Sequence, residues 1–513
     1  MFFGCNRNEV EPVALTLTSQ QEIDGMIQLG KRLENPYTVE NMTNAYEKLR
    51  FTGLLRSDIE IVPTHYYLRF LPADNEELAL LTDEPLDWYD YPLDYEIKEG
   101  GTFYHDPTLP IEQLTWQYVV VPIDYKLPKV KYEKICDAFM VGNDKEVIGG
   151  RTTGLLNEED WKMLEKEAYT MTGNLDSEDK KNSGRVEASD WYPSGYIRAW
   201  DDVTSTYKPV NRALVRAQRF LRTEKDYTAD NGYYRMPGSF SNDVNYSIKW
   251  EQDDFDIRDG SYGQAYFNGP KQTGSWNLYI NRTQHPKTNL FVNIHNAAVI
   301  YYYHNGRYGI RKPSDNSLFT GRLHIAGKDK DGRAHYYNFN DYFLFAAEVV
   351  IFSQKKGQPG WYLNTRDIFG VTIHELAHVS HWHLNYSTLA YFISWVGAGV
   401  RVPESWATGV EWYITNEEYG TSDYNDYYYQ HMTLATIQGK DYKPIVIDLI
   451  DDYNQSTVYG SGYPNDQVIG YRLDQIEHAL GSAMNWWVWR DKLKEFYDHP
   501  TEEHVDYIFE NYQ

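Results

Sequence analysis

The stretch over residues 367–385, DIFGVTIHELAHVSHWHLN, constrains this chain most, because it contains the pattern HExxH from His374 to His378. On an α-helix, residues four apart lie on one face and are separated by about 6 Å along the axis, so both imidazoles can reach one ion. Two imidazole nitrogens and a carboxylate suit Zn²⁺, which keeps a further position for water. The pattern therefore predicts a zinc site on a helix, with Glu375 beside the water.

Two surface histidines on a solvated helix are the alternative reading of this pattern. Residues 368–379 are largely apolar and lack the charges of an exposed helix. Ile373, Leu376, Ala377 and Ser380 form an opposite stripe of small and apolar side chains that suits packing against a core. We therefore favour a buried helix that carries a metal site.

A zinc site needs a third protein ligand, and His381 shares a helix face with His374 and His378. Seven residues of straight helix rise about 10 Å, however, which is too far for three nitrogens within ~2.1 Å of one ion. Leu384 stands where the metzincin pattern requires another histidine, so that pattern is excluded. His381 and His383 are expected to be structural or supporting groups.

A carboxylate from a second helix is the other solution. Residues 402–413 predict a helix, because Pro403 suits a helix start. Glu404, Thr408 and Glu411 then fall on one face. A solvated helix carboxylate is the alternative for either glutamate.

With an HExxH helix followed by a helix that carries a glutamate, the chain resembles the gluzincin metallopeptidases. The resemblance implies that His374, His378 and Glu404 bind one zinc ion and that Glu375 is the general base. Glu404 lies in Pro-Glu-Ser-Trp-Ala, whereas many gluzincins place their ligand after an asparagine. Glu411 therefore stays open as the ligand, and if Glu404 is the ligand, Glu411 is expected to support a histidine.

Hydrolysis also needs a group that stabilises the negative charge developing on the carbonyl oxygen. Tyr463, Tyr471 and His478 come late in the chain, in a Gly-rich segment and the helix after it, and are the candidates. A tyrosine beside glycine is more often a packing residue, and the sequence does not choose among the three.

The charge balance bears on the partners of the chain. Its 513 residues carry 74 acidic and 49 basic side chains, a formal net charge of −25. This charge repels nucleic acid and no basic run offers an exception, so no nucleic-acid partner is expected. No apolar run approaches the roughly 18 residues that a membrane helix needs, so no transmembrane helix is expected either.

The first residues suggest a different membrane attachment. Met1-Phe2-Phe3-Gly4-Cys5 resembles the end of a bacterial lipoprotein signal, in which Cys5 would be lipidated. The polar residues 6–12 favour a tether over a core strand, although Cys5 could also be incidental. We therefore expect a lipoprotein of the bacterial cell envelope, either periplasmic or on the outer-membrane surface.

The pattern of elements predicts a multidomain α+β protein. Residues 1–18 would be the tether, and residues 19–190 an N-terminal α/β module of unknown function. Part of that module resembles the N-terminal region of many lipoproteins of Bacteroidetes-type bacteria. Residues 191–283 resemble the carboxypeptidase-regulatory-like β-sandwich, an Ig-like or prealbumin-like fold that implies a spacer or binding module. Residues 284–513 would be the zincin-type catalytic domain, with a mixed sheet and helices.

Hydrophobic periodicity and capping residues predict the individual elements. Helices are expected over residues 19–33, 38–49, 161–172 and 289–303, and as one helix over 473–487. Strands are expected over residues 65–71, 117–123, 196–200, 213–220, 233–236, 246–250, 278–280, 323–326 and 346–352, the last of which could also be helix.

The predicted function is zinc-dependent hydrolysis of peptide bonds in a protein or peptide substrate by a cell-envelope metallopeptidase. Two alternatives remain. One is a glycan- or surface-binding lipoprotein whose metal is structural or lost, because aromatic residues make up 16% of the chain. The other is a zinc hydrolase that acts on glycopeptides or peptidoglycan cross-links.

Overall fold

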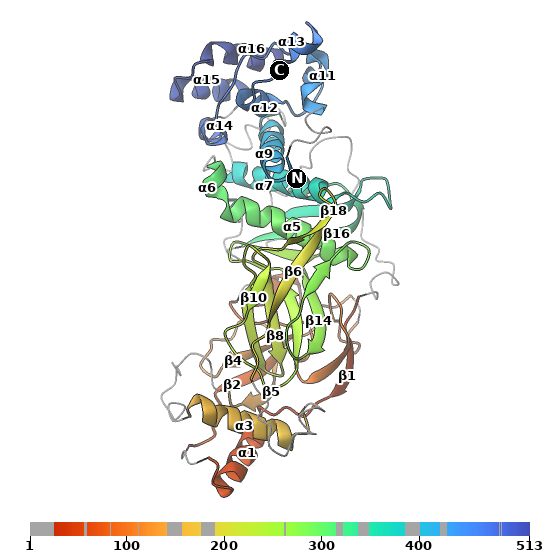
Figure 1. Ribbon diagram of the computed structural model, residues 1–513, viewed down its shortest axis with the longest axis vertical. Helices are drawn as coiled ribbons and strands as arrows, with labels where there is room; N and C mark the ends of the chain where they lie inside the picture. The colour runs from red at the N-terminus through yellow and green to blue at the C-terminus, as the bar shows by residue number, and fades with distance from the viewer. Residues whose placement is uncertain are drawn as a thin grey trace.

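The computed structural model is elongated, with an N-terminal region at one end, β-sheets in the middle and a helical region at the other end (Figure 1). The expected tether and Cys5 lie outside the residues that it describes. Those residues are 25–55, 59–82, 84–110, 112–140, 156–175, 190–260, 263–313, 322–336, 348–384, 401–420, 428–481, 483 and 485–513.

The N-terminal region contains two small antiparallel sheets, β1-β3 and β4-β2-β5, with helices beside them. Helix α1 begins after Thr38, whose Oγ1 accepts a hydrogen bond from Asn41 N at 3.2 Å, as the sequence predicts. The helix expected over 19–33 is wrong at its described end, because the backbone there pairs with β3. The elements are β1 (Gln28–Arg32), α1 (Val39–Phe51), β2 (His65–Phe70), α2 (Asn75–Thr82), β3 (Tyr95–Glu99), β4 (Gln117–Pro122), β5 (Tyr132–Ala138) and α3 (Glu158–Met171).

The middle of the molecule contains two four-stranded sheets, one of order β10-β6-β15 with β7 beside β6, the other of order β14-β11-β8-β9. Side chains from both sheets share one core, in which the rings of Tyr246 and Trp276 lie 5.3 Å apart. All five strands expected here are confirmed. The elements are β6 (Ser194–Asp201), β7 (Thr206–Pro209), β8 (Leu214–Arg219), β9 (Arg222–Tyr227), β10 (Tyr233–Arg235), β11 (Val244–Lys249), β14 (Tyr266–Gln272) and β15 (Leu278–Ile280).

A five-stranded mixed sheet of order β13-β12-β16-β18-β17 follows. β12 and β13 come from the segment expected to form the sandwich, so the expected boundary at residue 284 does not separate the sheets. The reason is packing: Phe255 and Ile257 of β12 are fully buried, and α5 covers the sheet that they join. The elements are β12 (Phe255–Asp259), β13 (Gly263–Gln264), β16 (Leu323–Gly332), β17 (His335–Tyr336) and β18 (Val349–Lys355).

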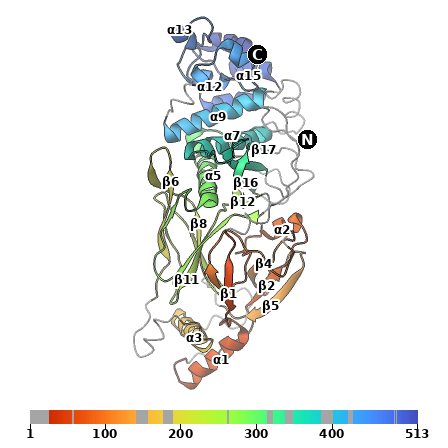
Figure 2. The same ribbon diagram turned by 90° about the vertical axis from the view of Figure 1, so that its right-hand side faces the viewer.

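Helices are stacked above this sheet, with α7 against it, α9 on α7 and α12 on α9 (Figure 2). The single helix expected over 473–487 is wrong: α14 ends at Leu480 with Gly481 as its C-cap, and Asn485 starts α15 by accepting backbone hydrogen bonds at 3.0 Å. The helices are α5 (Pro286–Tyr303), α6 (Asn305–Tyr308), α7 (Thr365–Leu384), α9 (Arg401–Tyr419), α11 (Leu434–Gln438), α12 (Ile445–Ile450), α13 (Gln455–Tyr459), α14 (Leu473–Leu480), α15 (Trp486–Phe496) and α16 (Val505–Asn511), with a short 3₁₀ helix at Glu502–His504.

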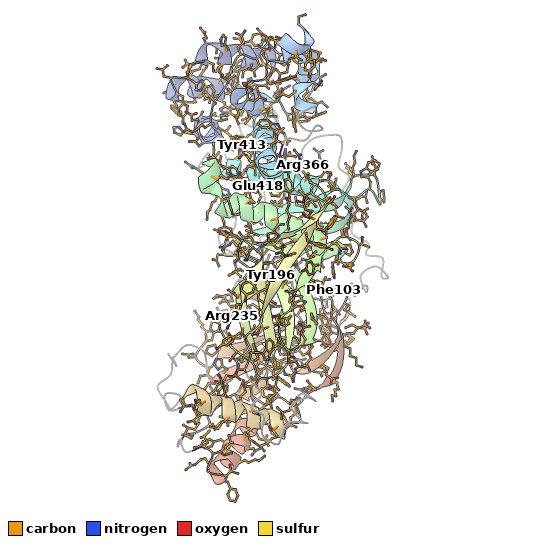
Figure 3. The ribbon with its side chains drawn as sticks, in the orientation of Figure 1. Phe103, Tyr196, Arg235, Arg366, Tyr413 and Glu418 are labelled. Carbon is orange, nitrogen blue, oxygen red and sulfur yellow. The ribbon has the colours of Figure 1, made fainter. Side chains whose placement is uncertain are left out.

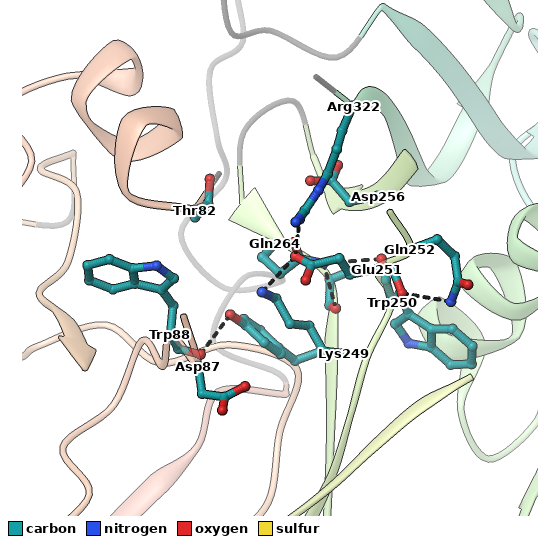
Figure 4. Close-up of polar contacts among 12 residues, drawn as sticks. Thr82, Asp87, Trp88, Lys249, Trp250, Glu251, Gln252, Asp256, Gln264 and Arg322 are labelled. Atoms are coloured by element: carbon teal, nitrogen blue, oxygen red, sulfur yellow. Dashed lines mark hydrogen bonds and ion pairs between the residues drawn. The ribbon is translucent and has the colours of Figure 1, made fainter. Parts of the chain in front are cut away.

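Buried polar contacts join the three regions (Figure 4). Lys249, at the end of β11, pairs with Glu251 at 2.6 Å, and Glu251 also pairs with Arg322 before β16 at 2.8 Å. Tyr266 donates its hydroxyl hydrogen to the Trp88 carbonyl of the N-terminal region at 3.3 Å. Because buried charges are costly unless they are paired, these contacts restrict how the regions sit on one another.

A search of the helices in the described ranges found none that is both long enough and apolar enough to cross a membrane.

Candidate metal centre

The HExxH residues lie on α7, which packs along α9. Arg366, near the start of α7, donates to Asn416 near the end of α9 at 2.8 Å, and His374, farther along α7, lies 3.0 Å from Glu411, nearer the start of α9. The two helices therefore run antiparallel. Figure 3 labels Arg366 of α7 together with Tyr413 and Glu418 of α9. Gly370 lies at this contact, where a Cβ would be 3.2 Å from Glu411 Oε1 and 3.3 Å from Thr415 Oγ1, so a larger residue would require these side chains to shift.

Two histidines and one glutamate meet between these helices. Glu404 Oε2 lies 3.6 Å from His374 Nε2, and Glu404 Oε1 lies 3.6 Å from His378 Nε2. The ligand atoms of the three side chains all lie within 4.8 Å of one another. His378 and Glu404 are buried, whereas the His374 side chain is 14% exposed.

These distances fit a tetrahedral zinc ion. A separation of 3.6 Å is longer than a hydrogen bond. Donors that each lie ~2.0–2.1 Å from one zinc ion are roughly 3.3–3.5 Å from each other, which is close to the observed spacing. The donor set of two imidazoles and a carboxylate is also one that zinc accepts.

Glu411 lies on the other side of the His374 ring. Its Oε2 is 3.0 Å from His374 Nδ1, which donates the hydrogen. This bond places the His374 proton on Nδ1 and leaves the Nε2 lone pair free of a proton on the side of Glu404. Of the two glutamates, Glu404 faces both Nε2 atoms and Glu411 orients one histidine.

Burial keeps His378 uncharged. Loss of solvent lowers the pKa of His378 to about 4, against the opposing effect of Glu404. A neutral imidazole is the form that binds a metal, so His378 needs no deprotonation at neutral pH.

Glu375 is buried on the same helix. Burial raises the pKa of Glu375 to about 7, and the nearby Glu404 adds to the rise while His374 opposes it. Its Oε2 has no hydrogen-bond partner among the described residues. A carboxylate that titrates near neutral pH and keeps one oxygen unused can take up a proton and release it again.

The other histidines of α7 have different surroundings. His381 is fully buried one turn beyond His378, and burial lowers its pKa to about 3. His383 Nδ1 donates to the carbonyl of Val379 at 2.9 Å, within the helix. His381 is absent from the group whose ligand atoms converge.

The three candidates for stabilising the carbonyl oxygen make their described contacts elsewhere. Tyr471 stacks on His499 with ring centres 4.1 Å apart. His478 Nδ1 lies 2.7 Å from the hydroxyl of Tyr497, and the ring of Tyr463 lies 5.1 Å from that of Tyr459. None of these contacts supports a role for them at the metal centre.

Arg333 is a site neighbour that no sequence pattern indicated. It follows β16, and its positive charge lowers the pKa of Glu375. The adjacent β17 pairs antiparallel with β18 and contacts α7. Only the fold brings this end of the sheet to the HExxH helix, so a scan for motifs cannot find it.

Comparisons of the chain with protein-family models, with curated proteins and with solved structures found no match.

Proposed function

We propose that the protein is a zinc-dependent hydrolase of peptide bonds. The observation that carries this proposal is the convergence of His374, His378 and Glu404, whose facing atoms have the spacing of zinc ligands, with Glu375 buried beside them. A structural zinc site is closed by four protein ligands, whereas three ligands and an adjacent carboxylate suit a catalytic one.

Bound zinc supplies a Lewis acid that polarises the substrate carbonyl and makes water acidic enough to attack near neutral pH. Glu375 accepts the proton of the attacking water on its carboxylate and then donates it to the leaving amine. Glu411 holds the His374 ring through Nδ1 so that Nε2 stays directed at the ion.

The substrate in this proposal is an extended peptide. β17 is the last strand of its sheet in the described part of the chain, and it contacts the HExxH helix. The edge of a sheet presents unpaired backbone groups, to which an extended peptide can add as a further strand. A peptide bound in this way would pass the ion in one fixed direction.

The same proposal includes the wider architecture. The sheets of residues 194–280 would be a sandwich that acts as a spacer or binding module, and the region from α5 onwards a zincin-type catalytic domain. Lipidation of Cys5 would attach the protein to the cell envelope. Metabolic labelling with a fatty-acid analogue tests this step, and equal labelling of the Cys5→Ser variant would contradict it.

A substrate panel tests the enzymatic proposal. We expect the zinc-loaded protein to cleave an unfolded polypeptide, and Glu375→Gln to lower that rate by about 10²- to 10⁴-fold while zinc stays bound. Glu417→Gln, an exposed glutamate on α9, is the matched control and should cleave at the wild-type rate. Unchanged cleavage by Glu375→Gln would contradict the mechanism, and cleavage of glycopeptides or peptidoglycan alone would change the substrate class.

A further inference from the structure

A second group of convergent ligands lies in the C-terminal helical region, outside the HExxH site. Asp448 of α12, Asp451 at the end of α12, and Asp466 offer carboxylate oxygens that lie within 4.8 Å of one another. Asp448 and Asp466 are almost fully buried. Three ionised carboxylates cannot share so small a buried volume without a positive charge among them.

No basic side chain is among the groups that act on the two buried members, Asp448 and Asp466, in the described part of the chain. Those groups are each other, Asp451, a tyrosine and a glutamine, and backbone. Burial and the neighbouring carboxylates raise the pKa of both residues. Asp448 and Asp466 therefore need either protons or a cation.

A buried glutamine borders the cluster. Gln455, the first residue of α13, is 1% exposed, and its amide nitrogen donates to Asp448 Oδ1 at 3.1 Å and to Gln430 Oε1 at 2.8 Å. Gln430 in turn donates to Asp451 Oδ2. Amide groups, which carry no net charge, thus contact both Asp448 and Asp451.

The surrounding hydrogen bonds hold the carboxylates in place. Tyr512, near the end of the chain, donates to Asp448 Oδ2, and the Val468 amide donates to Asp466 Oδ1 at 2.9 Å. Asp466 Oδ2 has no partner in the described part of the chain. One oxygen of Asp466 is thus fixed by the backbone, and the other is left facing the cluster.

We propose that Asp448, Asp451 and Asp466 form a structural calcium site. All the donors are oxygens, which hard cations prefer and zinc does not. Ca²⁺ accepts roughly six to eight oxygen ligands in flexible geometry. Mg²⁺ usually keeps several of its waters, so a buried site binds Mg²⁺ less favourably. The ion would join α12 to the loop at Asp466, and the hydrogen bonds that Asp448 accepts from Gln455 and Tyr512 would connect the site to α13 and the C-terminal end.

The test uses the full chain, stripped with EGTA and then titrated with Ca²⁺, Mg²⁺ or Zn²⁺. We expect about one Ca²⁺ per chain by equilibrium dialysis with radioactive calcium at this cluster, together with a rise of several degrees in the unfolding temperature. Mg²⁺ should give a smaller rise at the same concentration. Glu404→Gln should leave calcium binding unchanged, which separates this site from the proposed zinc site.

Asp466→Asn gives the sharper outcome, because it keeps the side-chain shape and the bond from Val468. Removing a charge should make the EGTA-treated variant at least as stable as wild type, whereas in Ca²⁺ the wild type should be the more stable. Asp452→Asn, an exposed neighbour, is the matched control and should behave like wild type.

Two outcomes would overturn the proposal. One is an equal calcium-induced shift in Asp466→Asn and wild type. The other is no calcium bound by wild-type protein, which would mean that shared protons neutralise the cluster. Equilibrium dialysis of the wild-type protein tests for calcium binding even if the Asp466→Asn variant does not fold.

Discussion

The HExxH centre and the C-terminal acidic cluster differ in how each would behave without an ion. In the first, burial keeps His378 neutral, and Glu404 faces the Nε2 atoms of both histidines. In the second, every ligand is an acid, so removing the ion leaves charges that repel one another. The proposed zinc and calcium sites therefore differ in donor chemistry, and we predict that calcium removal destabilises the protein more than zinc removal.

The largest expected effect tests the assignment of ligands within the HExxH centre. Replacing Glu411 by alanine should weaken zinc binding about 10- to 100-fold, the usual cost of losing a group that orients a ligand. Glu404→Ala should weaken zinc binding more, because Glu404 faces both histidines. Competition with a chromogenic chelator measures both affinities.

Glu417→Ala, on the exposed face of the same helix, serves as the control for this pair of variants. A larger loss of zinc affinity in Glu411→Ala than in Glu404→Ala would reverse their roles. Neither variant should alter calcium binding, because the acidic cluster lies on different helices.

The dependence of stability on pH tests the role of a buried histidine outside the HExxH centre. His295 on α5 is fully buried against Trp250, and burial lowers its pKa to about 4. The unfolded chain takes up this proton near pH 6.5, so the free energy of unfolding should fall as the pH drops from about 6.5 to about 4. The full loss should be on the order of 3 kcal/mol.

Urea unfolding of EGTA- and zinc-chelator-treated protein across this range measures the effect. His295→Asn removes the titrating group, so its stability should change less between pH 6.5 and pH 4 than that of wild type. Parallel pH curves for the two proteins would show that His295 does not carry the effect.

The smallest expected effect concerns the contact between the helices that carry the two centres. Gly409 of α9 packs on Val446 of α12, and a Cβ at Gly409 would lie 2.2 Å from Val446 Cβ. Gly409→Ala should therefore lower the free energy of unfolding by about 1–3 kcal/mol through overpacking. Because it moves α9 against α12, it should weaken zinc and calcium binding together.

Gly306→Ala is the control for this substitution, because no atom lies within 4 Å of a Cβ built there. Chemical denaturation compares the two variants. Equal stability of both, or loss of only one metal, would show that the two centres are not linked through this contact.

The sequence predicted local structure well where one residue or one pattern decides it. Thr38 caps α1 as expected, and the alternating strands of the middle region are confirmed. The prediction failed where pairing with residues distant in the sequence determines the structure. Residues 28–32 pair with β3, and β12 joins the sheet of β16 across the expected domain boundary. The Gly481–Asn485 break was missed because the apolar spacing of α14 continues in the sequence to Trp487, whereas α15 buries Trp486, Trp489 and Leu493 instead.

At the candidate site, helix periodicity was enough to place His374 and His378 on one face. It could not choose between Glu404 and Glu411, because both lie on the face of α9 that meets α7 and only the packing of the two helices separates them. No sequence motif indicated Arg333 or the acidic cluster. Asp448 and Asp451 lie three residues apart on α12 and at its end, but Asp466 comes from a separate loop, and the ligand atoms of all three meet only in the folded state.

The most direct test of the central claim is a crystal of the purified protein measured on both sides of the zinc absorption edge. We predict one anomalous peak that appears only above the edge, bounded by His374 Nε2, His378 Nε2 and a Glu404 oxygen, at ~2.0–2.2 Å from each. A protein that hydrolyses peptides but shows no peak there, or shows its zinc at another group of residues, would contradict the account.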